Sequence, residues 1–388
     1  MTLLDPIRHL GDRFSRGWQA QSPVEAVRAF GTSSKPWVRD GLADVLARVG
    51  ATAPARFARG ALTIVTFHRV LPQDRLKGYP IPGLAVTPEQ LELVLGELVQ
   101  HFECGTVIEA FRRWQREPRA KRPALGISFD DGALDNYEHA RPVLAKLGLS
   151  ATFYIPVDNV EHHTAPWHDR LGFALLKSAA PARKGGAGFE ALLAPFGLSR
   201  AAFSAILPDD ALRLASAGVA AAKDLAAERR GAAIDALEAA LGGDQVADYA
   251  GMMSWDQVRE LHADGHEIGS HSLTHPLLPG LSDERVREEV EVSRRRLSSA
   301  VGASVDSFCY PNGSFDSRTV AAVRAAGYEC AVTTRWGLNR KQPPLELARC
   351  DMDFARLQSR HGEFSRERLW FRLSGLQPGL AEAAPSAY

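Results

Sequence analysis

Cysteine is scarce in this chain of 388 residues, and neither sign of charge is in excess. The four cysteines follow no paired or CxxC spacing, which argues against a disulfide framework and against a zinc ribbon. Lysine and arginine together number 46, as do aspartate and glutamate, so the formal net charge is zero. Because no basic excess draws the protein to nucleic acid, we expect no nucleic-acid partner.

Long hydrophobic runs are also missing. No stretch is apolar for long enough to span a bilayer, and the first residues lack the apolar core and cleavage site of a signal peptide. We therefore expect a cytoplasmic protein. One helical stripe near the start could still lie on the inner face of the membrane or meet polymer-synthesis machinery, although we favour packing on the main domain. This stripe consists of Leu3, Ile7, Leu10, Phe14 and Trp18.

Short, nearly all-apolar runs alternate with amphipathic helices through much of the chain. Such runs indicate strands that are buried on both faces, and their alternation with helices predicts parallel β/α architecture. The predicted strands are 61–67, 124–129, 151–155, 266–270, 307–310 and 329–334. A full barrel has eight strands, so the pattern predicts an α/β fold with a distorted, incomplete (β/α) barrel of about six to seven parallel strands.

Composition divides the chain into four parts. Residues 61–159 and 251–355 form the predicted barrel, and residues 160–250, rich in alanine, leucine and charged residues, form a helical insertion. Residues 1–60 are a helical N-terminal extension, and residues 356–388 are a C-terminal tail. The helices of the barrel are expected at 88–101, 136–147, 254–264, 282–299 and 317–326.

Polar residues gather where the predicted strands end. Active sites of (β/α) barrels lie at the carboxyl ends of the strands, so these residues are expected to share one site. They are His68, Asp130, Asp131, His271, His275, Pro311, Asn312, Arg335 and Trp336.

Two of these positions suggest a metal centre. His271 and His275, joined by one aspartate, would give a three-ligand site with positions left for water and substrate. In metalloproteases a glutamate follows the first histidine of HxxxH, and here Ser272 stands there, which excludes that class. Asp130 and Asp131 point in opposite directions at a strand end, so one can bind metal while the other acts as a base. The alternatives are ordinary surface or core histidines and an exposed turn.

A second histidine-rich stretch lies at 161–169. It offers His162, His163, His168 and Asp169. No strand end fixes its spacing, so we interpret it as a solvated loop, with Trp167 as an anchor for the insertion.

Three segments resemble the leading motifs of one family. SFDDG (128–132), SHSLTH (270–275) and YPNG (310–313) are similar to those of the polysaccharide deacetylases, also known as the NodB-homology domain or carbohydrate esterase family 4. The resemblance spans about Leu62–Val157 and Gly251–Asp353. It implies a distorted (β/α) barrel and a metal-dependent hydrolase that removes N-acetyl, in some members O-acetyl, groups from sugars.

The resemblance also implies roles for single residues. By motif position, Asp131, His271 and His275 correspond to the metal ligands, and Asp130 corresponds to the general base. One divalent metal is implied, and two histidines with a carboxylate suit zinc best, with cobalt, nickel or iron also compatible. The backbone N–H of Asn312 corresponds to a donor for the oxyanion.

The chain departs from the family pattern in two places. Cys309 stands where an arginine usually orients the base, and the late histidine that usually supplies the general acid is absent. This combination resembles a branch found in bacterial exopolysaccharide pathways, which carries a first-strand histidine, here His68, and a late arginine, here Arg349. We expect His68 to replace the acid and Arg349 to replace the arginine. A core histidine and a structural salt bridge are the alternatives.

These features together predict a metal-dependent deacetylase. Its substrate would be an acetylated carbohydrate, either a sugar polymer or a lipid-linked glycan of bacterial polysaccharide biosynthesis. Tyr310, Pro311 and Trp336 are the expected sugar contacts. Two alternatives remain, an amidase of the same fold that acts on a small C–N substrate and a non-catalytic carbohydrate-binding member of a polymer-synthesis assembly.

Overall fold

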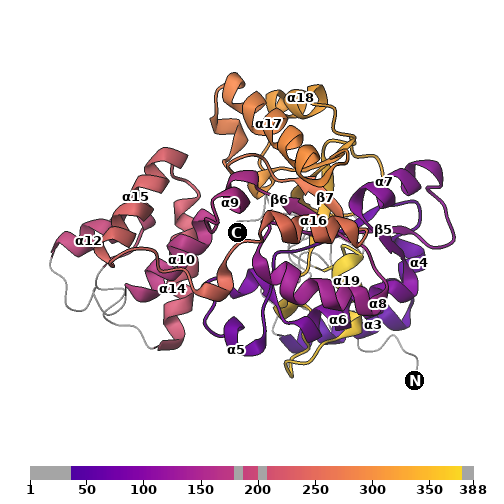
Figure 1. Ribbon diagram of the computed structural model, residues 1–388. Coiled ribbons are helices and arrows are strands. Elements are labelled where there is room, and N and C mark those ends of the chain that lie inside the picture. The colour runs from indigo at the N-terminus through magenta and orange to yellow at the C-terminus, as the bar shows by residue number, and fades with distance from the viewer. Residues whose placement is uncertain (1–35, 179–186, 200–207, 378–388) are drawn as a thin grey trace, which may run out of the picture.

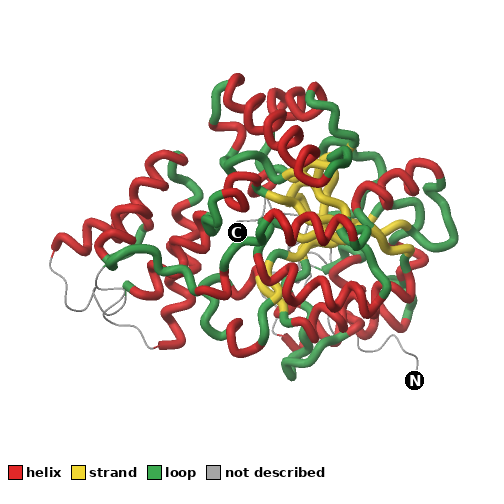
Figure 2. The backbone as a smooth tube through the Cα atoms, viewed as in Figure 1, coloured by secondary structure: helices red, strands yellow, loops and turns green. Residues whose placement is uncertain are grey.

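The computed structural model describes residues 36–178, 187–199 and 208–377. Their strands form a barrel that helices surround, and a lobe of further helices lies to one side of it (Figure 1, Figure 2). The predicted stripe between Leu3 and Trp18 lies outside the described residues.

Seven parallel strands close the barrel, which confirms the predicted fold class. In order round the ring they are β1 (Thr63–Phe67), β10 (Leu347–Asp351), β9 (Cys330–Trp336), β8 (Ser307–Cys309), β7 (Glu267–Ser270), β6 (Thr152–Ile155) and β5 (Ala124–Phe129). The pairing of β1 with β5 completes the ring. Because all seven run in one direction, their carboxyl ends share one rim.

The ring is distorted at β5, where two strands share one edge. A short strand, β4 (Glu103–Gly105), pairs with residues 124–126, and β6 pairs with residues 128–129. Neither β4 nor β10 is among the strands predicted from sequence. β4 has three residues and Arg349 interrupts the apolar run of β10, so neither shows the pattern on which strand prediction depends.

Helices cover the outside of the ring and begin at caps that the sequence encodes. They are α6 (Pro88–His101), α7 (Val107–Arg116), α8 (Arg141–Leu147), α16 (Trp255–Ala263), α17 (Asp283–Val301) and α18 (Ser317–Ala325). Thr87, Thr106 and Ser254 each form a capping box at the start of a helix. Gly148 and Gly302 end α8 and α17 in the left-handed conformation. These signals fix the lengths of the loops between helices and strands.

An aromatic layer supports the rim. β1, β5 and β6 are buried along their whole length, as expected for strands covered on both faces. The ring of Phe129 stacks on those of Phe67 and Phe153, with centroids 5.4 Å and 5.1 Å away. Phe67 precedes His68 and Phe129 precedes Asp130, so two predicted site residues project from a rigid layer.

The lobe of helices lies within the predicted insertion. It contains α10 (Trp167–Lys177), α12 (Ala187–Leu193), α14 (Pro208–Ala222) and α15 (Ala227–Ala240). Its apolar cluster includes Leu175, Phe196 and Ile234, together with Tyr79 and Ile81 from the segment that follows β1. The lobe thus has a hydrophobic core of its own, and it packs against the rim of the barrel.

Helices near the two ends of the described chain pack together. α3 (Pro36–Arg48) contacts α19 (Arg366–Leu373), which lies in the region expected to be a tail. Trp370 of α19 is buried against Phe57 and Phe102, so this part of the tail is folded onto the barrel. No helix in the described part of the chain is both long and apolar enough to cross a bilayer.

Candidate active site

The predicted residues meet at a small cavity of about 60 Å³ on the rim of the barrel. The segments that follow strands β1, β5 and β7 contribute the side chains of His68, Asp130, Asp131, His271 and His275. The segment after β8 adds Tyr310 and Asn312. Six of the nine residues that the sequence placed at strand ends therefore line one cavity, whereas Pro311, Arg335 and Trp336 do not. The insertion adds further side chains, which are Trp167, His168, Val219 and Lys223.

Three of these side chains form a triangle of ligand atoms. Oδ1 of Asp131 lies 3.4 Å from Nε2 of His271 and 3.3 Å from Nε2 of His275. The two Nε2 atoms are 3.1 Å apart. A tetrahedral ion with ligand bonds of about 2.0–2.1 Å separates its ligand atoms by roughly 3.3 Å, so the donor set fits one divalent cation. Two imidazoles and a carboxylate match the ligand preference of zinc.

Neighbouring groups orient both histidines toward the triangle. Nδ1 of His271 lies 2.8 Å from the carbonyl oxygen of Cys309, and donation to this carbonyl directs Nε2 toward the triangle. Burial lowers the pKa of His271, but Cys309 and Asp131 outweigh burial and hold that pKa well above its usual value, so binding of a cation here would displace a proton. Burial, together with the nearby His271, lowers the pKa of His275 to about 4. His275 is therefore neutral at physiological pH, as a metal ligand must be.

Backbone strain is concentrated at this site. Of the five described non-glycine residues with positive φ, four lie in or beside the cavity: Asp131, Ser272, His275 and Asn312. Left-handed conformations are costly for such residues and persist only where the surroundings hold them. The buried Glu289 of α17 supplies part of that hold, since it accepts hydrogen bonds from the backbone N–H groups of Leu273 and Thr274. No local sequence pattern indicates this role of Glu289.

Asp130 is buried and paired with one guanidinium. Nη1 and Nη2 of Arg349 donate to its two carboxylate oxygens, each at 2.7 Å. Burial alone would raise the pKa of Asp130, but Arg349 outweighs burial and holds that pKa below its usual range. Arg349 is itself fixed by bonds to the carbonyl of Thr333 and the hydroxyl of Thr66. Asp130 is thus an oriented, ionised carboxylate.

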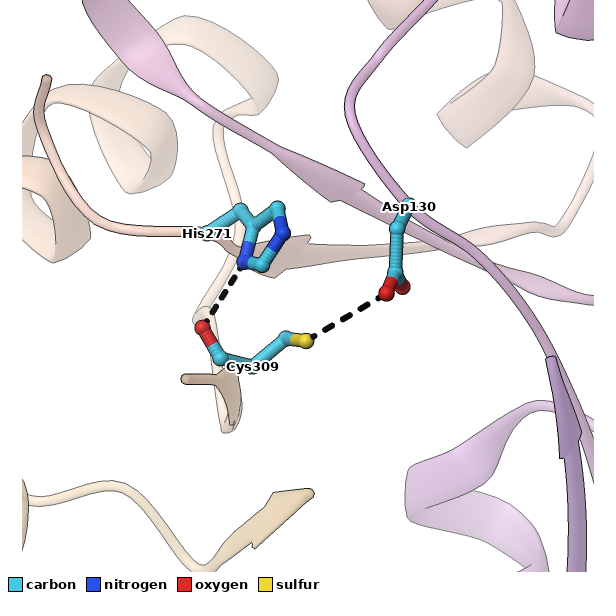
Figure 3. A group of neighbouring side chains, drawn as sticks. All are labelled: Asp130, His271 and Cys309. Carbon is cyan, nitrogen blue, oxygen red and sulfur yellow. Dashed lines mark hydrogen bonds between the residues drawn. The ribbon is translucent and has the colours of Figure 1, made fainter. Parts of the chain in front are cut away.

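A second group of potential ligands overlaps the triangle. Asp130, His271 and Cys309 also bring a carboxylate, an imidazole and a thiol together (Figure 3). Both oxygens of Asp130 already accept from Arg349, however, and burial raises the pKa of the Cys309 thiol although Arg349 opposes this. A thiol binds metal as the thiolate. The group with Asp131 is therefore the better metal site.

His68 lies beside Asp130. Its Nε2 is 3.7 Å from Oδ2 of Asp130, and its side chain is 19% exposed. Burial lowers the pKa of His68, although the carboxylates of Asp130 and Asp131 oppose this effect. The imidazole is therefore neutral in the resting site at physiological pH and able to accept a proton.

The stretch at 161–169 is not the solvated loop that we inferred from the sequence. His162 and His163 are exposed, but the next part of the stretch begins α10 and is buried. Nε2 of His168 lies 3.6 Å from Oδ2 of Asp131. Asp169 has no exposed surface. The missed signal is the helix start after Pro166.

A buried ion pair holds this helix on the barrel. Oδ2 of Asp169 accepts from Nη1 of Arg69 at 2.6 Å, and Oδ1 accepts from the hydroxyl of Tyr79 at 2.6 Å. Nε of Arg69 also pairs with Asp135 at 2.6 Å. Arg69 follows His68 in the chain, so one network positions histidines on both sides of the cavity.

Of the three expected sugar contacts, only Tyr310 lines the cavity. Tyr310 lines the cavity, but its hydroxyl donates to the carbonyl of Leu345 and its ring packs on Phe308 and Phe315, so it is a wall residue. The residues that line the cavity do not include Pro311 or Trp336. The ring of Trp336 lies instead under the guanidinium of Arg372 on α19.

A larger groove, of about 1130 Å³, lies elsewhere. It is lined by residues of α3, α6 and the segment 359–367, and many of these are acidic, including Asp40, Asp44, Glu92 and Glu97. None of the predicted catalytic or metal residues belongs to its lining, so the small cavity at the rim is the candidate active site.

Comparison with known families agrees with this geometry. Residues 232–331 match the sequence profile of the family described as Polysaccharide deacetylase, and the matched segment contains His271, His275 and Asn312. Over this segment the chain is similar to the polysaccharide deacetylase family. The match begins within the insertion and does not include Asp130 or Asp131.

The individual proteins to which this chain is similar are distant. The uncharacterized protein YlxY of Bacillus subtilis (strain 168) is 33% identical over 57 residues, which cover 15% of this chain and 18% of that protein. A solved structure of the Streptococcus pyogenes deacetylase PplD in complex with acetate is 16% identical, with a TM-score of 0.48 and coverage of 75% of this chain and 92% of that one. IcaB from Ammonifex degensii is 18% identical, with a TM-score of 0.48 and coverage of 82% and 97%.

The guanidinium beside Asp130 comes from a strand that the sequence did not predict. Arg349 reaches Asp130 from β10, and its Nη2 passes 3.3 Å from Sγ of Cys309 on β8. The small side chain of Cys309 leaves room for this approach. An arginine at that position and one at position 349 would compete for the same carboxylate.

Proposed function

We propose that the chain is a metal-dependent deacetylase that hydrolyses the N-acetyl group of an acetylated sugar. The observation that carries this proposal is the triangle of Asp131, His271 and His275, with ligand atoms 3.1–3.4 Å apart, next to a buried Asp130. Zinc is the proposed metal. When bound there, a divalent cation supplies the Lewis acidity that makes water nucleophilic near neutral pH.

Asp130 is the proposed general base. Its pKa is held low by Arg349, which keeps the carboxylate ionised, and the bidentate pair fixes its orientation. A buried carboxylate is costly to maintain, and a site that only bound sugars would not require one. This is why we favour an enzyme over a non-catalytic carbohydrate-binding protein. The backbone N–H of Asn312, in its left-handed turn, is the proposed donor to the oxyanion.

His68 is the proposed general acid. It lies 3.7 Å from Asp130 and is neutral in the resting site, so it can take the proton that Asp130 removes from water and deliver it to the leaving amine. The amine leaves as a neutral group only when this proton reaches it. The proposed substrate class is an acetylated amino sugar of bacterial polysaccharide biosynthesis, and an amidase of small C–N substrates is the second candidate.

Replacing His68 with alanine is expected to slow acetate release by roughly 10²–10⁴-fold while the metal stays bound, because proton transfer is lost and the ligands are kept. Metal content by mass spectrometry and initial rates of acetate release measure the two effects. His168→Ala is the comparison on the opposite side of the cavity. If His168→Ala has the larger loss and His68→Ala is unchanged, the acid comes from the insertion.

Acetate release from an N-acetylglucosamine oligosaccharide tests the function itself. Purified protein is assayed after chelation and after addition of Zn²⁺ or Co²⁺, beside Asp130→Asn. We expect metal-dependent release from the native protein and none above background from the variant, which should bind metal normally. Absence of acetate with every metal, despite a bound ion, would count against deacetylation of this sugar. Ammonia or acid release from small amides would then favour the amidase.

A further inference from the structure

The main chain around His68 is held by two neighbouring side chains from one short helix. Nδ2 of Asn136 donates to the carbonyl oxygen of His68 at 2.7 Å, and Oδ1 of Asp135 accepts from the backbone N–H of Val70 at 2.7 Å. Asn136 and Asp135 have no exposed surface. His68 lies between β1 and β2 (Arg69–Val70) and belongs to neither strand, so these two bonds fix its main chain beyond the end of β1.

The amide of Asn136 has one evident role, which is donation by its nitrogen. Nδ2 also lies 3.0 Å from Oδ1 of Asp135, so two acceptors face the nitrogen and assign the orientation of the amide. Oδ1 of Asn136 is buried and has no hydrogen-bond partner among the described residues. Because an unpaired buried amide oxygen costs free energy, the bonds made by Nδ2 account for a polar side chain at this position.

The helix that carries Asn136 directly follows the segment of the two cavity aspartates. Asn136 begins a π-helical turn, η2 (Asn136–Ala140), and such turns are rare and often occur at functional sites. The backbone N–H of Asp130 donates to the carbonyl of Phe67 at 3.0 Å. One continuous segment therefore bonds the main chain on both sides of His68, and these contacts set the 3.7 Å distance between His68 and Asp130.

We propose that Asn136 is a positioning residue, which holds the imidazole of His68 beside Asp130 through its hydrogen bond to the carbonyl of His68. This inference rests on the proposed function, in which His68 is the general acid. Asn136 is not among the residues that line the cavity, so its effect on the reaction comes through His68. A displacement of about 1 Å in a reacting group can cost roughly 10²-fold in rate, so a small shift of this main chain is sufficient.

Steady-state kinetics of acetate release test this role. Asn136→Ala and Asn136→Leu both remove the donor, and leucine keeps a branched side chain in place should the smaller residue prevent folding. We expect kcat to fall by roughly 10–100-fold with little change in KM, because proton delivery is impaired while the residues that line the cavity are kept. In the His68→Ala background the same replacement should cost little more, since it acts through the imidazole. Losses that multiply in the double variant would overturn the proposal.

Asn339 is the matched control at the opposite end of β1. It is equally buried, and its Nδ2 donates to the carbonyl oxygens of Ala348 at 2.9 Å and Leu62 at 3.3 Å. Leu62 directly precedes β1, far from the rim that carries the cavity. Asn339→Ala should lower thermal stability as Asn136→Ala does, and keep kcat. An equal loss of kcat in both variants would show that Asn136 only stabilises the fold.

NMR of the imidazole separates this inference from the proposed function. Zinc-loaded protein is prepared with ¹³C-labelled histidine, and the signal of His68 is identified by its absence from His68→Ala. We expect this signal to shift or broaden in the Asn136 variants and to be unchanged in Asn339→Ala. That result, in a native protein that releases no acetate, would support the positioning role while deacetylation failed. A His68 signal that neither Asn136 variant changes would overturn the inference, and acetate release by the native protein would then leave the function intact.

Discussion

Replacing His271 with alanine is expected to remove the bound divalent metal and acetate release together. His271 supplies one corner of the ligand triangle, and the loss of a direct ligand should weaken metal binding by more than the roughly 10–100-fold that a lost outer-shell partner costs. The metal's stabilisation of charge is worth several kcal/mol, so activity should fall by about 10³-fold or more. Metal content after gel filtration and acetate release at saturating zinc measure the two losses.

The matched control is a histidine at the other end of the same strand. His266 is also buried, accepts a hydrogen bond from the backbone N–H of Ala151 and packs edge-on against Phe153, but lies at the start of β7 and outside the cavity. His266→Ala should lower thermal stability through the cavity it leaves and keep both metal and activity. If His271→Ala keeps one bound metal and full rate, the ligand assignment is wrong.

Most residues that line the candidate site could be predicted because local sequence patterns indicate where each strand ends and in which direction it runs. Apolar runs mark the strands, and parallel β/α alternation places whatever follows them on one rim. His68, Asp130, Asp131 and His271 were found in this way, and they line one cavity in the structure. The distorted barrel followed from the same runs.

What the sequence could not predict depends on contacts between distant residues. His168 and Asp169 look like part of a polar loop, yet the pair of Asp169 with Arg69, 100 positions away, buries both and brings His168 to Asp131. Trp336 follows an apolar run as the other site residues do, but the packing of α19 turns it away from the cavity. Such placements are decided by tertiary packing, which no local pattern records.

The pairing of Arg349 with Asp130 could be predicted from the sequence only in part. The need for a cation was visible from Cys309, which stands where the family pattern has arginine, whereas the strand that carries the replacement was not predicted. In Figure 3 the small thiol of Cys309 lies close to Asp130, and Sγ of Cys309 is 3.6 Å from Oδ2 of Asp130. The geometry makes Arg349 the residue on which both the stability of the buried carboxylate and the orientation of the base depend.

Replacing Arg349 with methionine is therefore expected to lower the free energy of unfolding by roughly 3–5 kcal/mol, because Asp130 would be left as an uncompensated buried charge. Acetate release should fall by about 10²-fold or more even where the variant is folded, since the base loses its orientation. Arg349→Lys keeps the charge without the two parallel hydrogen bonds, so it should be intermediate in stability. Thermal unfolding and rates at a temperature below both transitions measure these effects.

Two further variants distinguish the loss of charge compensation at Asp130 from the loss of packing around position 349. Adding Asp130→Asn to Arg349→Met removes the uncompensated charge and should recover part of the stability but none of the activity. Arg372 is equally buried and bonds both oxygens of Asp351, whose side chain is 22% exposed. Arg372→Met should destabilise less than Arg349→Met, because water can reach Asp351, and it should keep its activity. Equal stability losses without loss of acetate release in Arg349→Met would show that Arg349 only stabilises the fold.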